Sequence, residues 1–108
     1  LKEQKSGTIV FINSLAGKQG YVNHTLYSTS KFAFNGFSQS LRLEAKKYGI
    51  RVISIHPGGV KTSLYDKLSI KPDVDQYMDP AKLAEIIVYL AETEGLSPDD
   101  ISISRTTK

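Results

Sequence analysis

Two short runs of aliphatic and β-branched residues constrain the fold of this chain more than any other feature. Residues 8–13 read TIVFIN, which is nearly continuous in apolar side chains, and residues 50–55 read IRVISI. Runs of this kind are typical of strands covered on both faces, as in a parallel sheet. Gly, Pro or Ser follows each run within a few residues, so both are predicted to be short strands.

The segment between these strands has the pattern of an amphipathic helix that begins at Leu26 and ends at Tyr48. Gly49 follows it, in the position where a glycine commonly terminates a helix. Apolar residues recur every four positions along one stripe, which a second phenylalanine widens. The members of this stripe are Ala33, Phe34, Phe37, Leu41 and Ala45.

A second helix is predicted to begin at Asp79 and Pro80, since aspartate caps helices and proline suits the first turn. It stops before Gly95, and residues 101–104 alternate as a short strand. Residues 60–78 have no regular pattern and are predicted to be a loop with a short helix at 64–68. The expected buried stripe of the second helix comprises Leu83, Ile86, Ile87 and Leu90.

The order of elements is therefore strand, helix, strand, helix, strand, which predicts an α/β fold with a parallel sheet and flanking helices. In open α/β sheets, ligands bind outside the carboxyl ends of the strands. Ser14 follows the first strand, and Pro57 and Gly58 follow the second. Tyr27 and Lys31 begin the helix that leaves the same edge. We expect these side chains to converge there.

Tyr27 and Lys31 are four residues apart, so a helix places them on one face about one turn apart. An ammonium group beside a phenol favours the phenolate, which suits a tyrosine that acts as a general acid/base. Taken alone, such a pair is more often two exposed neighbours on a helix. Ser14, likewise, is in isolation most simply a cap for a backbone group at the strand end.

Three motifs occur in order and together resemble the short-chain dehydrogenase/reductase family. They are INSLAG at residues 12–17, YSTSK at residues 27–31, and PGGVKT at residues 57–62. Tyr27 lies thirteen positions after Ser14, which is the usual interval in that family. The resemblance extends from Gly7 to about Thr62 and more loosely beyond. It implies a Rossmann-like fold and an NAD(P)-dependent oxidoreductase that acts on a small carbonyl or alcohol substrate.

The resemblance also implies a role for each motif residue. Tyr27 would exchange a proton with the substrate oxygen, and Ser14 would donate a hydrogen bond to that oxygen. Lys31 would assist Tyr27 and hydrogen-bond the nicotinamide ribose. Cofactor contacts are accordingly expected from Tyr27 and Lys31 and, around the nicotinamide and its phosphates, from Pro57, Gly58, Val60 and Thr62.

Other family motifs are missing from these 108 residues. The sequence has neither the glycine-rich turn that receives the cofactor diphosphate nor the segment that separates NAD from NADP use. We therefore expect residues 1–108 to be the C-terminal catalytic portion of one Rossmann-like domain, inactive by itself. The alternative is a non-catalytic module that associates through the helix from Leu26 to Tyr48. On either hypothesis that helix would form a homodimer or homotetramer, for example through Phe34, Phe37 and Leu41.

Composition argues against several other functions. The net charge is only +3, with Lys and Arg scattered, so nucleic-acid binding is not expected. No apolar run approaches the ~18 residues that span a bilayer, and the absence of cysteine fits the reducing cytoplasm. His24 and His56 lack partners at metal-ligand spacing, so no metal site is predicted, and His56 is expected to be structural. Gln19, Tyr21 and Asn23 either contact substrate or form a solvated loop.

Overall fold

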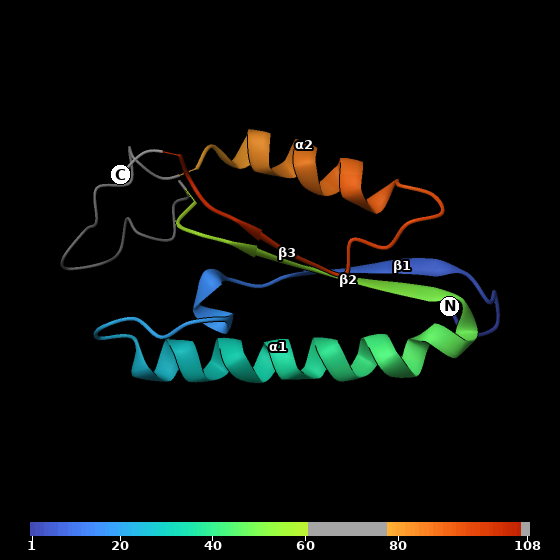
Figure 1. The fold of residues 1–108 in the computed structure, drawn as a ribbon, viewed down its shortest axis with the longest axis horizontal. Helices are drawn as coiled ribbons and strands as arrows, with labels where there is room; N and C mark the ends of the chain where they lie inside the picture. The colour runs from blue at the N-terminus through green and yellow to red at the C-terminus, as the bar shows by residue number, and fades with distance from the viewer. Residues whose placement is uncertain (61–77, 107–108) are drawn as a thin grey trace.

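A computed structural model describes residues 1–60 and 78–106, and it confirms the α/β class, with parallel strands between flanking helices (Figure 1). Thr62 and the predicted short helix at 64–68 lie outside the described residues. In chain order the elements are β1 (Gly7–Ile12), the 3-10 turn η1 (Leu15–Gly17), α1 (Thr25–Ala45), the 3-10 turn η2 (Lys46–Tyr48), β2 (Ile50–Pro57), α2 (Pro80–Ala91) and β3 (Asp100–Ile103).

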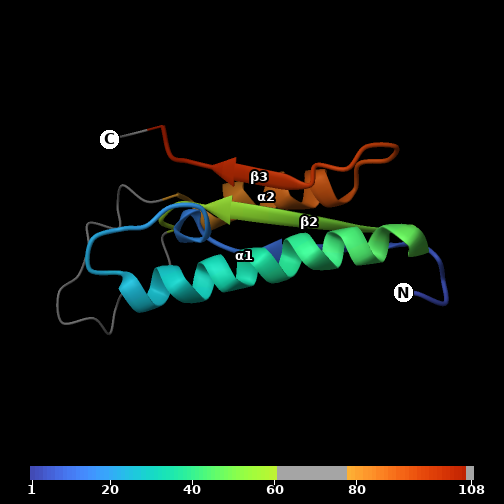
Figure 2. The same ribbon diagram turned by 60° about the horizontal axis from the view of Figure 1, so that its bottom comes forward.

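The sheet has the order β1-β2-β3, and both strand pairs are parallel. Gly7 lies opposite Ile50, and β3 begins with Asp100 opposite Ser54. Helix α1 covers one face of the sheet and α2 covers the other (Figures 1 and 2). The central strand β2 is therefore enclosed on both faces, which explains why its Val52 and Ile53 have no exposed surface.

Apolar packing between α1 and the sheet is concentrated on β1 and the first half of β2. The ring of Phe11 meets the ring of Phe34 edge to face, with 5.1 Å between centroids. Nearer the C-terminal end of α1, Ala45 packs with Ile50 and Val52 in a buried cluster. Edge-to-face aromatic pairs and aliphatic burial of this kind stabilise a helix on a sheet without requiring one exact register.

The inward face of α1 does not follow the apolar stripe seen in the sequence. Ala33 is exposed and Phe37 is 59% exposed, whereas Ser38 is fully buried. Its Oγ lies 3.0 Å from the Oγ of Ser54, one polar contact within a largely polar inner face. Ser28 and Asn35 are also buried on this helix. The stripe is an incomplete guide because buried polar residues share the inner face of α1 with Phe34, Leu41 and Ala45.

Arg42 explains much of that polar face. Strand β3 begins only opposite Ser54, so the carbonyl of Val52 has no β3 partner. The Arg42 Nε donates to this carbonyl at 2.9 Å, and its Nη2 donates to Ser54 Oγ and to the carbonyl of Asp99. A single guanidinium thus bonds to a carbonyl of β2 and to the carbonyl directly before β3, and it joins both to α1.

Helix α2 is anchored at both ends. The Asp79 side chain accepts a hydrogen bond from the Ala81 backbone, which confirms the predicted N-cap. At the other end Arg51 donates to the carbonyl of Ala91 at 2.7 Å, close to where helix carbonyls lack partners. The helix ends there, before Gly95, and Ile86 is 44% exposed, so its predicted burial is wrong.

The connection from α1 to β2 turns at Gly49, as the sequence predicts, after η2 finishes the helix as a 3-10 turn. Gly49 has φ +71°, a left-handed conformation that disfavours other residues. A Cβ atom there would lie 2.5 Å from the carbonyl oxygen of Lys5. Glycine at this position therefore allows β2 to start directly beside the segment that precedes β1.

Candidate functional site

The carboxyl ends of the strands, η1 and the start of α1 lie at the same end of the molecule (Figure 1). Ser14 follows β1 after a single intervening residue, and Pro57 is the last residue of β2. Tyr27 and Lys31 occupy the first two turns of α1. This is the edge at which open α/β sheets bind ligands, so the arrangement places the predicted catalytic side chains where a ligand would arrive.

Ser14 is the N-cap of η1. Its backbone is extended, with φ −157°, and its Oγ accepts a hydrogen bond from the Ala16 N–H at 3.1 Å. A serine hydroxyl has one donor hydrogen besides its acceptor lone pairs. The cap uses only the oxygen as an acceptor, so the hydroxyl hydrogen stays available to a substrate. Capping and a catalytic hydrogen bond are therefore compatible in the same side chain.

The turn that begins with Ser14 packs directly against the backbone of α1. Asn13 Nδ2 donates to the carbonyl of Lys31 at 3.3 Å, and Asn35 Nδ2 donates to the carbonyl of Gly17 at 3.1 Å. A Cβ atom on Gly17 would lie 2.9 Å from Asn13 Nδ2 and 3.0 Å from the Lys31 carbonyl oxygen. The close approach of turn and helix therefore depends on glycine at this position, and it brings the Ser14 turn beside Lys31.

Tyr27 joins this cluster through Lys31. The Lys31 Nζ lies 5.5 Å from the centroid of the Tyr27 ring and 5.9 Å from that of Phe34, within the range of cation–π attraction. Tyr27 is 48% exposed, so its ring can be reached from solvent. The His24 ring meets the Tyr27 ring edge to face, with 6.1 Å between centroids.

The end of β2 approaches the same turn from the sheet. The Gly58 N–H donates to the carbonyl of Ile103, and a Cβ on Gly58 would lie 3.4 Å from Leu15 Cδ1 and 3.3 Å from Met78 Cε. Val60 forms an isolated bridge with Met78. Buried Pro57 and close-packed Gly58 therefore lie next to the Ser14 turn, while Val60 lies farther along the same loop.

Several polar residues at this edge were not predicted as site residues from the sequence. Asn13 and Asn35 fix the turn to α1, and Lys18 forms an ion pair with Asp100, with 2.6 Å between Nζ and Oδ1. Their partners are mostly backbone carbonyls, which every residue has, so a sequence pattern cannot predict these contacts. Only Asn13, directly before Ser14, could have been found, because the motif itself contains it.

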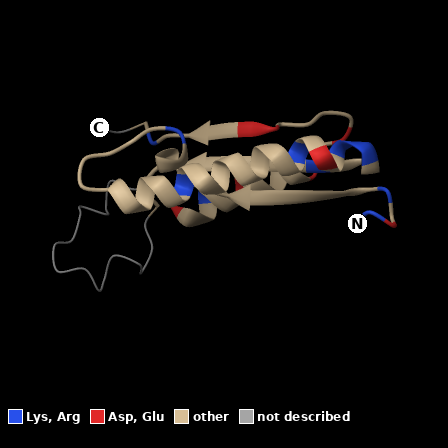
Figure 3. Cartoon of the chain, turned by 90° about the horizontal axis from the view of Figure 1, so that it is seen from below, with Lys and Arg blue, Asp and Glu red and all other residues tan. Residues whose placement is uncertain are grey.

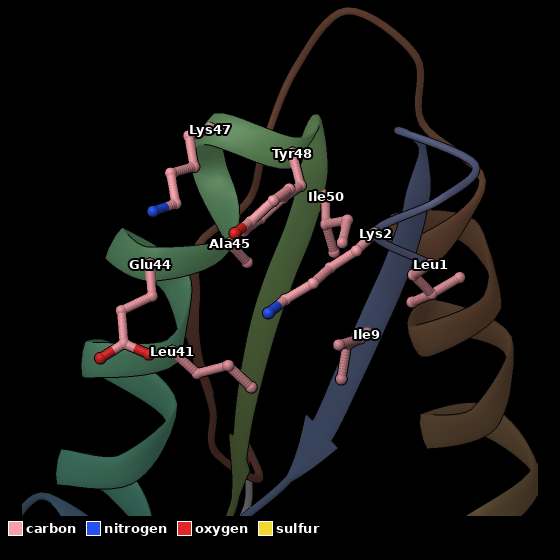
Figure 4. Close-up of a pocket in the computed structure, with 9 residues that line it drawn as sticks. All are labelled: Leu1, Lys2, Ile9, Leu41, Glu44, Ala45, Lys47, Tyr48 and Ile50. Carbon is pink, nitrogen blue, oxygen red and sulfur yellow. The ribbon is translucent and has the colours of Figure 1, made fainter.

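A cavity of about 410 Å³ lies at the other end of the molecule, between the C-terminal end of α1 and the starts of β1 and β2 (Figure 4). Leu41, Tyr48 and Ile50 line it, and no predicted catalytic residue does. Within residues 1–60 and 78–106, no group of three or more His, Cys, Asp or Glu side chains is arranged to hold a metal ion. No helix in the described part of the chain is long and apolar enough to cross a membrane.

Comparison with known proteins decides the family. The family model described as short chain dehydrogenase matches residues 1–73, more than half of the chain. The chain belongs to the short-chain dehydrogenase family. The resemblance of the three motifs is thereby confirmed at the level of the family.

Two curated relatives are similar to this short-chain dehydrogenase chain over most of its length. It is 37% identical over 98 residues to a 3-alpha-(or 20-beta)-hydroxysteroid dehydrogenase of Mycobacterium bovis, covering 88% of this chain and 38% of the relative. It is 32% identical over 107 residues to a putative ketoacyl reductase of Streptomyces coelicolor, covering 82% of this chain and 41% of that protein.

The fold comparison agrees. A crystal structure of a short-chain dehydrogenase from Streptomyces avermitilis matches with a TM-score of 0.77 and 28% identity, covering 94% of this chain and 43% of that structure. The chain thus spans about two fifths of the length of the named relatives. The Rossmann-like arrangement of parallel strands with flanking helices is the fold of the family.

The packing of the Ser14 turn on α1 yields a test. Gly17→Ala is expected to destabilise the protein by about 1–3 kcal/mol, because the added methyl group has no room between Asn13 and the Lys31 carbonyl. Gly20→Ala is the matched control, since a Cβ on Gly20 meets nothing within 4 Å. Urea unfolding of both variants measures the difference, and equal midpoints would show that turn and helix are not in close contact.

Proposed function

We propose that this chain carries the catalytic groups of an NAD(P)(H)-dependent oxidoreductase that interconverts a carbonyl and an alcohol. One observation supports this above the others: the Ser14 turn packs on α1 at Lys31, one helical turn from Tyr27. Three side chains of complementary chemistry, a hydroxyl, a phenol and an ammonium, thereby share one edge of the sheet. Family membership adds independent support.

In the reductive direction, the proposed roles follow from the chemistry of each side chain. The Tyr27 hydroxyl gives its proton to the substrate oxygen, and the Ser14 hydroxyl donates a hydrogen bond to the same oxygen as negative charge develops there. Lys31 Nζ, 5.5 Å from the centroid of the Tyr27 ring, places a positive charge beside the group that gives up the proton. In the oxidative direction the phenolate accepts the proton from the alcohol.

The described residues fit the nicotinamide end of the cofactor. Lys31 has three N–H donors for ribose hydroxyls, and the Tyr27 ring is half-exposed beside it. Gly58 brings backbone close to the Ser14 turn, and we propose that it borders the nicotinamide with Pro57 and Val60. When bound, a reduced nicotinamide supplies the hydride that the substrate carbon receives. Thr62 remains a predicted contact outside the described residues.

These residues account for only part of a dinucleotide site. The sequence has no glycine-rich turn for a diphosphate, and the chain spans about two fifths of its named relatives. We propose that residues 1–108 act as the C-terminal catalytic portion of a Rossmann-like domain and are inactive as an isolated piece. NAD and NADP are both retained as cofactors, and a cytoplasmic location stays a prediction.

Association through α1 is the second part of the proposal, and it is also the basis of the non-catalytic alternative. Only Lys31, Arg42 and Glu44 are charged within α1, and the charged residues gather toward its C-terminal end (Figure 3). Phe34 and Leu41, through which association was expected, are instead partly buried against the sheet. The exposed apolar side chains of this helix are Leu26, Tyr27, Phe32, Phe37 and Leu43. Polar residues and Glu44 are exposed among them, so the outer face is mixed, with charge only near its C-terminal end. The exposed aromatic and aliphatic side chains favour a second copy of the chain as the partner.

Removing the Tyr27 hydroxyl tests the enzymatic proposal in the native polypeptide that contains these residues. Tyr27→Phe is expected to lower kcat about 10²–10⁴-fold because the general acid/base is lost. Ser14→Ala is expected to lower kcat about 10²–10³-fold through loss of the hydrogen bond to the developing oxyanion. Reduced-nicotinamide absorbance reports turnover of a panel of ketones and aldehydes. Tyr89→Phe, on the outer face of α2, is the control, and an active Tyr27→Phe enzyme would refute the assigned role.

Cofactor binding separates the two functional hypotheses. A polypeptide of residues 1–108 is expected to bind NADPH and NADH weakly or not at all, because it has no glycine-rich turn for the diphosphate. Nicotinamide fluorescence during titration measures this, with the native polypeptide titrated in parallel. Tight binding by the 108-residue chain would contradict the partial-site proposal. Absence of binding by the native polypeptide would favour the non-catalytic module.

Association is tested at Gly36, which lies on the outer face of α1. A Cβ on Gly36 meets nothing within 4 Å in the protomer, so Gly36→Glu should fold normally and gain some helix propensity. If α1 forms the interface, the added carboxylate is buried between copies and should convert the oligomer to monomer. Light scattering coupled to size exclusion measures the mass. Tyr89→Glu, exposed on α2, should leave the mass unchanged, and an unaltered mass for Gly36→Glu would exclude this face.

A further inference from the structure

His56 is a buried titratable residue that the proposed reaction does not use. It lies near the end of β2, directly before Pro57, and its side chain has no exposed surface. Transfer of an imidazole out of water is costly unless its nitrogens find polar partners. The contacts of its two ring nitrogens therefore indicate the role of the side chain.

The first contact is with the residue that bears the proposed catalytic hydroxyl. His56 Nδ1 lies 3.2 Å from the backbone carbonyl oxygen of Ser14. A carbonyl oxygen can only accept, so Nδ1 must carry a hydrogen and donate it. This bond joins the end of β2 to the turn that follows β1, at the backbone of the residue that carries the proposed catalytic hydroxyl.

The second nitrogen faces an acid on the neighbouring strand. His56 Nε2 lies 3.1 Å from Asp100 Oδ1, an ion-pair distance, although the two atoms are not aligned as a hydrogen bond. The same Asp100 oxygen lies 2.6 Å from Lys18 Nζ. Lys18 immediately follows η1, so Ser14 and Lys18, which flank the turn, are both tied to this pair of side chains from the sheet.

Helix α1 holds the turn from the opposite side. Asn35 donates to the carbonyl of Gly17, and Asn13 donates to the carbonyl of Lys31. The turn is thus held by directional bonds from the sheet and from α1, and its freedom to shift relative to Tyr27 is small. Loss of the His56 donor would leave the Ser14 carbonyl with only the Gly17 N–H, a bond within the turn, and the Lys18–Asp100 pair as the remaining contact on the sheet side.

We propose that His56 is a positioning residue for the reaction: its Nδ1–H bond to the Ser14 carbonyl sets where the Ser14 hydroxyl meets the substrate oxygen. The Asp100 carboxylate faces the other ring nitrogen at 3.1 Å. This role rests on the proposed function of Ser14. It predicts an effect on the chemical step, since a displacement of about 1 Å in a catalytic group lowers rates up to 10²-fold.

The two nitrogens can be tested separately in the native polypeptide. His56→Asn places an amide N–H near the position of Nδ1, whereas His56→Gln places its amide near Nε2. His56→Asn is expected to keep kcat within about threefold of wild type, while His56→Gln and His56→Leu lower it by about 10–100-fold. The KM for the cofactor should change less than about twofold, because His56 acts on the Ser14 turn. Equal kcat values for Asn and Gln variants would overturn the assignment of Nδ1.

A double-mutant cycle separates positioning from general destabilisation. In a Ser14→Ala background, His56→Gln is expected to cause no further loss of kcat, because the hydroxyl that it positions is already absent. A loss of the same size in both backgrounds would overturn the proposal and leave His56 with a purely structural role. Thermal unfolding of each variant verifies that the folded protein is being assayed.

An NMR measurement tests the contact without any reference to activity. The ¹⁵N shifts of His56 are expected to show a hydrogen on Nδ1, and a bare Nδ1 would overturn the proposal. If wild type and every variant lack nicotinamide-dependent turnover, the proposed function fails and the catalytic role of His56 fails with it. A measured Nδ1 hydrogen together with an active wild type and equal activity in all His56 variants would refute the positioning role alone.

Discussion

Directional hydrogen bonds between α1 and the sheet are the constraint on which the rest of the site depends. Apolar contacts such as Phe11 against Phe34 hold the helix down but tolerate small shifts along its axis. The hydrogen bonds from Arg42 to the carbonyls of Val52 and Asp99 do not tolerate such shifts, because each bond weakens steeply with distance and angle. Arg42 therefore sets the register of the helix. Tyr27 lies about four turns away on the same rigid element and inherits that register.

The sequence was sufficient to predict the architecture, since the relevant signals are local. Aliphatic runs, the Gly49 terminator and the Asp79 cap each depend on a few neighbouring residues, and the structure agrees with all of them. The inner face of α1 was not predictable in the same way. Helical periodicity weighs apolar side chains, whereas Ser38 is buried because a serine on β2 faces it. That partnership depends on strand register, which the pattern does not contain.

The candidate site also contains residues that the sequence predicts and residues that it does not. Ser14, Tyr27 and Lys31 could be selected by their spacing and by family resemblance, because their chemistry is conspicuous. Asn13, Asn35 and His56 hold these groups through bonds to backbone carbonyls, and any residue can supply a carbonyl. His56 was expected to be structural, and its side chain is fully buried. Its connection to Ser14 emerges only in three dimensions.

The placement of unsatisfied polar atoms supports a functional edge independently of the family. Within residues 1–60 and 78–106, the buried side-chain atoms that lack a hydrogen-bond partner are Asn13 Oδ1, Ser28 Oγ, His56 Nε2 and Asp100 Oδ1. Each belongs to a residue that flanks Ser14 or Tyr27, or that contacts the Ser14 turn or Lys18. Two of them still have charged neighbours, since Asp100 Oδ1 lies 2.6 Å from Lys18 Nζ and 3.1 Å from His56 Nε2. A buried polar atom without any partner costs about 1–3 kcal/mol. Natural proteins retain these costs chiefly at functional sites, and here they gather at the edge that holds the proposed acid/base rather than beside the cavity at the other end.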